Sequence, residues 1–159
     1  MLVIFGTLLS LPLLLNLTAA RGDYRKHVDA VFAAGMLCAI WAFTNIVAHI
    51  YPFPQSKEFH PLVDLIGLSA MIAAYMTQRQ RWKFLLASLF FAQLCAHAWF
   101  WVAWRNSPEG GIGYRYILTL NLLWFGQLLC VGAPGGTYVA NRALGWMRRH
   151  GSLPDPARS

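Results

Sequence analysis

The feature that most constrains this chain is the grouping of its apolar residues into five long blocks separated by short polar segments. At ~1.5 Å rise per residue, a helix of about 20 apolar residues crosses the ~30 Å hydrocarbon core of a bilayer. A helix pairs its own backbone polar groups in lipid, whereas a lone strand leaves them unpaired. The sequence therefore predicts an all-helical integral membrane protein. We expect five transmembrane helices, at about residues 2–20, 30–51, 62–77, 84–104 and 116–133.

The composition agrees with this class. Of the 159 residues, 57% are hydrophobic and only 12% are charged, whereas about 25% are charged in an average soluble protein. We expect residues 1–150 to form a single membrane domain. Because almost no aqueous surface remains, an enzyme acting in solution is not expected, and the sequence favours a protein that is not an enzyme.

The segment after the fifth block divides into two parts. Gly132, Gly135 and Gly136 flank Pro134, a pattern that breaks helices. Residues 137–149 then alternate apolar and basic positions with a helical period, which predicts a short amphipathic helix on the inner membrane surface. The alternative is a fifth helix that continues through the break. Residues 151–159 are predicted to be a disordered tail.

The basic residues predict the orientation in the membrane. Loops on the cytoplasmic side carry an excess of Lys and Arg. Of the 13 basic residues, three lie in the second and fourth connections: Lys57, Arg105 and Arg115. The other ten lie in the first and third connections and in the tail, and are Arg21, Arg25, Lys26, Arg79, Arg81, Lys83, Arg142, Arg148, Arg149 and Arg158. We expect the N-terminus outside and the C-terminus inside, with a first helix that is not cleaved. The net charge of +7 then reflects topology and attraction to lipid headgroups, and not nucleic-acid binding.

Polar side chains inside the predicted spans gather in the outer half of the membrane. Such groups are costly in lipid, so their position is informative. They come from four helices and are Asn45, His49, His60, Asp64, Gln93, His97 and Asn121. Asn, Gln and His commonly hydrogen-bond between membrane helices. We therefore expect Asn45, Gln93 and Asn121 to form hydrogen bonds that support helix packing.

Two cofactor hypotheses remain open for the same cluster. His49, His60, Asp64 and His97 have the donor types of a transition-metal site. His49 and His97, on facing helices, could instead hold a b-type haem. A proton path through the His and Asp groups is a third possibility.

We expect a small multi-pass accessory or scaffold component of a membrane complex. Steps of small residues, at Ala33–Ala39 and Gly67–Ala70, would allow close helix contact within the chain or with a partner. Partners are therefore the lipid bilayer, other membrane subunits or a second copy. The alternatives are a haem- or metal-binding redox protein and a phage holin-like or channel-forming protein. The small size and the positive-inside bias favour the inner membrane of a bacterium.

Overall fold

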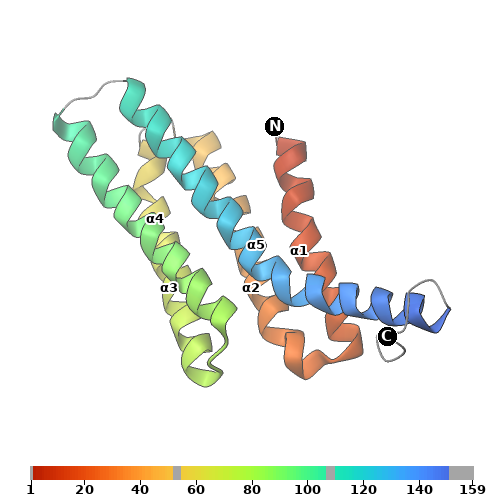
Figure 1. Cartoon of the computed structure of the whole chain (residues 1–159). Coiled ribbons are helices and arrows are strands. Elements are labelled where there is room, and N and C mark those ends of the chain that lie inside the picture. Colours follow the sequence, from red (N-terminus) through yellow and green to blue (C-terminus); the bar gives the residue numbers. More distant parts are fainter. Residues whose placement is uncertain (1, 52–54, 107–109, 151–159) are drawn as a thin grey trace, which may run out of the picture.

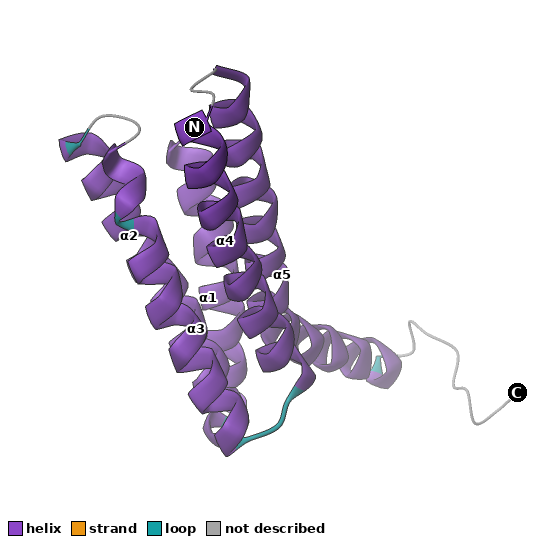
Figure 2. Cartoon of the chain, turned by 90° about the vertical axis from the view of Figure 1, so that its left-hand side faces the viewer, coloured by secondary structure: helices purple, strands orange, loops and turns teal. Residues whose placement is uncertain are grey.

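The computed structural model describes residues 2–51, 55–106 and 110–150, with the side chains of residues 2–6, 26, 55, 56 and 110 left aside. All regular secondary structure in this part of the chain is helical (Figure 2), as predicted, and it contains no strand. It comprises five α-helices and one short 3-10 helix, which are α1 (Leu2–Gly22), α2 (Tyr24–Ile50), η1 (Gln55–Glu58), α3 (His60–Thr77), α4 (Arg81–Asn106) and α5 (Gly110–Arg149). The predicted tail, 151–159, lies outside the described residues.

Two helix pairs are joined by α5. Helices α1 and α2 pack along each other, as do α3 and α4, and α5 contacts α4, α1 and α2. In Figure 1 the first half of α5 accordingly runs between α4 and α1. In that view α2 and α4 end, and α3 and α5 begin, at the upper end of the bundle, and the α1–α2 and α3–α4 connections lie at its lower end. The main core consists of apolar side chains from all five α-helices, among them Leu9, Leu37, Met71, Phe90 and Val131.

Four of these helices are long and apolar enough to cross a membrane: α2 from His27 to Ile50, α3, α4, and α5 from Gly111. Helix α1 has 21 residues, but the side chains of its first five residues are not described. Within the described residues, four helices could therefore span a membrane.

Helix α5 differs from the predicted span followed by a separate helix. It is one helix of 40 residues that contains Pro134. The structure therefore agrees with the alternative prediction, in which the fifth helix continues through the break. Proline removes one backbone donor and crowds the preceding turn, which bends a helix. Figure 1 shows the consequence, because the last part of α5 turns away from the bundle at its lower end. The Thr137 hydroxyl donates to the Ala133 and Pro134 carbonyl oxygens at this bend, at 2.9 Å each.

Helices α1 and α5 cross at very short range where α5 bends. A Cβ atom on Gly135 would lie 2.6 Å from the Leu15 carbonyl carbon and 2.7 Å from the Asn16 nitrogen. The Asn16 amide nitrogen donates to the Pro12 oxygen at 2.9 Å and to the Val131 oxygen at 2.8 Å. The absence of a side chain at Gly135 therefore lets the two backbones meet, and Asn16 links them.

We expect Gly135→Ala to destabilise the protein, whereas Gly136→Ala should not. The new methyl group at position 135 meets backbone atoms that cannot rotate away, and such overpacking costs about 1–3 kcal/mol. At Gly136 a Cβ meets nothing within 4 Å, and Ala is favoured over Gly in a helix by up to ~1 kcal/mol. Thermal unfolding of both variants in detergent measures the difference. Equal midpoints would contradict the close α1–α5 crossing.

The steps of small residues are used within the chain. Ala33 and Ala34 are fully or almost fully buried in the core. A Cβ on Gly67 would lie 2.5 Å from the ring of Phe90, so α3 and α4 meet closely there. The small residues were predicted to allow close helix contact within the chain or with a partner, and the structure contains such contacts within the chain.

Candidate functional site

A cavity of about 260 Å³ lies between α2, η1, α3, α4 and α5 toward the upper end of the bundle. Three kinds of side chain line it. Apolar and aromatic groups form part of the wall, and the rest is formed by amide or hydroxyl groups and by charged or titratable groups. The lining residues are Ile40, Trp41, Thr44, Asn45, Ala48, Lys57, His60, Asp64, Gln93, Ile117, Leu120, Asn121 and Trp124.

Five of the seven predicted site residues line this cavity. They come from four helices, as expected, and are Asn45, His60, Asp64, Gln93 and Asn121. His97 is buried and contacts the site through Asp64. His49 is exposed on α2 and is not among the lining residues. The structure thus brings most of the predicted polar cluster together and leaves His49 outside it.

His97 is held from both sides of its ring. Its Nε2 atom lies 2.8 Å from Oδ2 of Asp64, and its Nδ1 atom lies 2.6 Å from the Tyr116 hydroxyl oxygen. An Nε2–H donor to the carboxylate and a Tyr116 O–H donor to Nδ1 satisfy all three groups with a neutral imidazole. Because all three residues are buried, the network fixes α3, α4 and α5 to one another near the cavity.

Tyr116 was not predicted as a member of the site. It is fully buried, and its ring stacks on Phe100 with the ring centroids 4.1 Å apart. In the sequence it stands at the start of an apolar block, where a tyrosine is typical of the membrane interface. Only the rotation of α5 against α4 reveals that its hydroxyl group faces His97.

His60 brings an unpartnered buried nitrogen to the site. Its Nε2 atom is buried and has no hydrogen-bond partner among the described residues. Its ring lies edge-on to that of His97, with centroids 6.0 Å apart. Buried polar atoms in proteins are nearly always paired, and an exception calls for an explanation such as water or a ligand. His60 therefore marks the wall where a molecule in the cavity would gain a hydrogen bond.

The amide side chains use partners that the sequence did not indicate. Asn45 donates to the Trp41 carbonyl oxygen of its own helix at 2.8 Å. Gln127 donates to Gln93 at 2.6 Å, which links α5 to α4. The pairs Asn45–His49 and Gln93–His97, each four residues apart, lie on one helix face as predicted, but among the described residues no hydrogen bond joins the two members of either pair.

The described residues do not gather the donors named in the two cofactor hypotheses at one point, and both hypotheses stay predictions. Both ring nitrogens of His97 are hydrogen-bonded, so neither is free to ligate iron, and His49 lies outside the cavity. No group of three or more His, Cys, Asp and Glu side chains in the described part of the chain is arranged to hold a metal ion. The geometry leaves His60 and Asp64 as the titratable groups that reach the cavity from α3.

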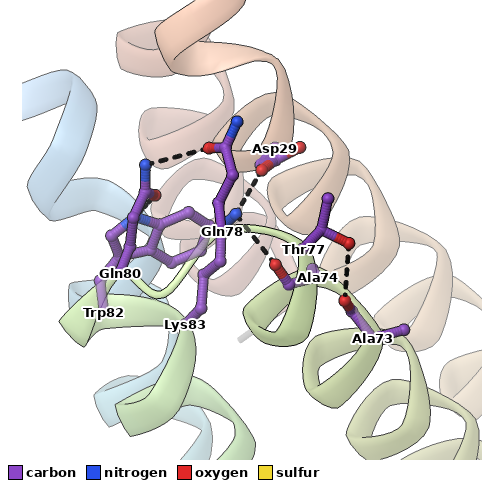
Figure 3. Close-up of polar contacts among 8 residues, drawn as sticks. All are labelled: Asp29, Ala73, Ala74, Thr77, Gln78, Gln80, Trp82 and Lys83. Carbon is purple, nitrogen blue, oxygen red and sulfur yellow. Dashed lines mark hydrogen bonds and ion pairs between the residues drawn. The ribbon is translucent and has the colours of Figure 1, made fainter.

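A second polar cluster lies at the lower end of the bundle. Lys83, assigned from the sequence to the third connection, instead lies in the first turn of α4, and its side chain has no exposed surface. It forms an ion pair with Asp29 of α2 and donates to the Ala74 oxygen of α3 at 3.2 Å (Figure 3). In the same close-up, Gln80 bonds the Gln78 side chain, and the Trp82 indole donates to Gln80 at 2.7 Å. Asp29 thus neutralises one of the ten basic residues assigned to the inner side.

Comparison with known proteins adds no functional information. No protein-family model matches the chain. No curated protein and no solved structure matches it either. The function must therefore be argued from the cavity and from the residues around it.

Proposed function

We propose that the protein is an integral membrane protein whose five α-helices all cross the bilayer, with the N-terminus outside and the C-terminus inside. Four helices have the required length and apolar character. Helix α1 has 21 residues, about 32 Å at the helical rise, and it packs along α2 and α5. Large apolar side chains are exposed on all five, for example Leu14, Phe32, Ile66, Phe91 and Leu122. A contiguous apolar surface of this extent suits lipid and not water.

The charge distribution supports the orientation. The basic residues predicted for the first and third loops lie within three residues of the α1–α2 and α3–α4 connections, which are at the lower end of the bundle in Figure 1. Arg142, Arg148 and Arg149 are exposed on the bent part of α5, beside the exposed apolar side chains of Leu144 and Trp146. We place this part of α5 on the inner headgroup layer, where basic residues meet anionic lipids. This asymmetry is the basis for proposing a bacterial inner membrane.

We further propose that the protein binds a small polar molecule in the outer half of the membrane, as an accessory component of a membrane system. The observation that carries the proposal is the cavity of about 260 Å³, whose polar wall comes from four helices and contains the unpartnered Nε2 atom of His60. Convergent polar groups in an otherwise apolar pocket are typical of ligand sites.

The proposal is tested by measuring water access to the cavity in intact cells. Cys38, Cys95 and Cys130 are first replaced by Ala, and Asn121→Cys is then compared with Leu122→Cys. Asn121 lines the cavity, whereas Leu122 is exposed on the outside of the bundle and faces lipid under the proposed topology. Thiols react as thiolates, which form in water, so a membrane-impermeant methanethiosulfonate added outside should modify position 121 roughly tenfold or more faster. Equal rates at the two positions would overturn the proposal of a hydrated outer cavity.

A further inference from the structure

One wall of the cavity carries two opposite charges that do not neutralise each other. Lys57, His60 and Asp64 all line it, at positions i, i+3 and i+7 of the segment that runs from η1 into α3. Within the described residues, Lys57 forms no ion pair, and the ion-pair contact of Asp64 is with His97. A cation and a carboxylate therefore face the same space without bonding to each other.

Each charge has a reason to attract a ligand. Partial burial lowers the pKa of Lys57 below its ordinary value, because desolvation disfavours the ammonium form when no anion compensates it. Asp64 lines the cavity and bonds His97 through Oδ2, and its second carboxylate oxygen, Oδ1, is the acceptor that we assign to a ligand. The Nε2 atom of His60, between the two charges, is buried and unpartnered. The wall thus offers hydrogen-bond donors at Lys57 and His60 and an acceptor at Asp64, about one helical turn further along the chain.

The size of the cavity limits what can occupy it. Pockets for drug-sized ligands are larger, at about 300–1,000 Å³. His60 and Asp64 are four residues apart, or ~6 Å along a helix, so the two polar ends of a bridging molecule lie only a few bonds apart. Ile40, Ile117 and Leu120 leave an apolar wall for the remainder.

We propose, on the basis of the function proposed above, that the cavity binds a small zwitterion of the amino-acid type. Its carboxylate lies toward Lys57 and His60, and its ammonium group lies toward Asp64. A simple amine would leave Lys57 unpaired and would be repelled by it. A simple carboxylate would face Asp64 at close range, and like charges brought together oppose binding.

The test measures the unfolding midpoint of the purified full-length protein in detergent with matched probes. L-Alanine is the zwitterion, propionate lacks its ammonium group, and ethylamine lacks its carboxylate. Glycine, β-alanine and L-leucine vary the spacing of the charges and the side chain. A ligand that binds the folded state raises the midpoint with its concentration. We expect at least one zwitterion to raise the unfolding midpoint in a saturable way, with half of the rise reached below about 10 mM. Either single-charge analogue should need at least a tenfold higher concentration for the same rise.

Two variants at the upper end of the wall identify the residues involved. Lys57→Gln should weaken zwitterion binding about tenfold, since a charge-assisted hydrogen bond is lost, and should leave ethylamine binding unchanged or stronger. Glu58→Gln is the matched control, because Glu58 is the exposed neighbour in the same 3-10 helix. Both positions lie outside the packed core, so folding should not be affected. Asp64→Asn should abolish the preference for the zwitterion over propionate.

The outcomes separate this inference from the proposed function. If no zwitterion raises the midpoint, or if a single-charge analogue does so equally well, the inference is overturned. Rapid modification of Asn121→Cys in the same protein would still support a hydrated binding cavity. If position 121 is also unreactive, both the inference and the proposed function fail.

Discussion

Replacing Asp29 with Ala should lower the free energy of unfolding by roughly 3 kcal/mol, which corresponds to a midpoint about 6–12 °C lower for a chain of this size. The side chain of Lys83 is 0% exposed, so loss of Asp29 leaves its ammonium group buried without a counter-charge. Removing one partner of a buried pair typically costs about 3–5 kcal/mol. We expect the lower end of this range, because 35% of the Asp29 side chain is exposed. Thermal unfolding in detergent is the measurement.

The double variant Asp29→Ala/Lys83→Met distinguishes the ion pair from simple packing. Replacing both charges by apolar groups removes the uncompensated ammonium, so most of the lost stability should return. Glu58→Ala removes an exposed carboxylate and should change the midpoint little. If Asp29→Ala behaved like Glu58→Ala, Lys83 would not depend on Asp29 in the folded protein.

His97→Leu should cost a similar amount, roughly 3 kcal/mol or more. The change leaves the Asp64 carboxylate and the Tyr116 hydroxyl buried without their shared partner. Tyr116→Phe removes only one neutral hydrogen bond and should cost about 1 kcal/mol. Unfolding midpoints of both variants, measured beside Ala98→Leu on the exposed face of the same helix, provide the comparison.

The triple variant Asp64→Leu/His97→Leu/Tyr116→Phe replaces the whole network by apolar groups. It should be more stable than His97→Leu alone, because no polar group remains orphaned. A triple variant that is less stable than the single one would contradict the network and would favour a purely steric role for His97.

The helices could be predicted from the sequence because their cause is local. Blocks such as residues 84–104 contain a full membrane crossing of apolar residues, and the structure places α4 there with a few residues added at each end. Pro134 with its flanking glycines suggested a break, but proline in a helix only bends it when neighbouring contacts hold the two halves. Those contacts join Val131 and Gly135 of α5 to Asn16 of α1, which lies more than a hundred residues earlier in the sequence.

The site was predictable in its location and less so in its pairing. The concentration of polar residues in the outer half indicated five of the lining residues. Which side chain bonds which depends on how each helix is rotated about its axis, and a single sequence does not contain that rotation. Tyr116 and Lys57 were missed for this reason, since each has an ordinary role at a membrane interface. Lys83 was assigned to a loop because its partner, Asp29, lies 54 residues earlier.

The measurement that tests the account most directly is the sidedness of the two termini. Five crossings place them on opposite sides of the membrane, whereas the four helices that meet the span criterion without α1 would place them on the same side. Epitope tags before Met1 and after Ser159 are probed with antibody in intact and in permeabilised cells. The account predicts that the N-terminal tag binds antibody in intact cells and that the C-terminal tag does so only after permeabilisation. Termini on one side, or the reverse orientation, would contradict it, and the cavity would then open elsewhere than on the outer surface.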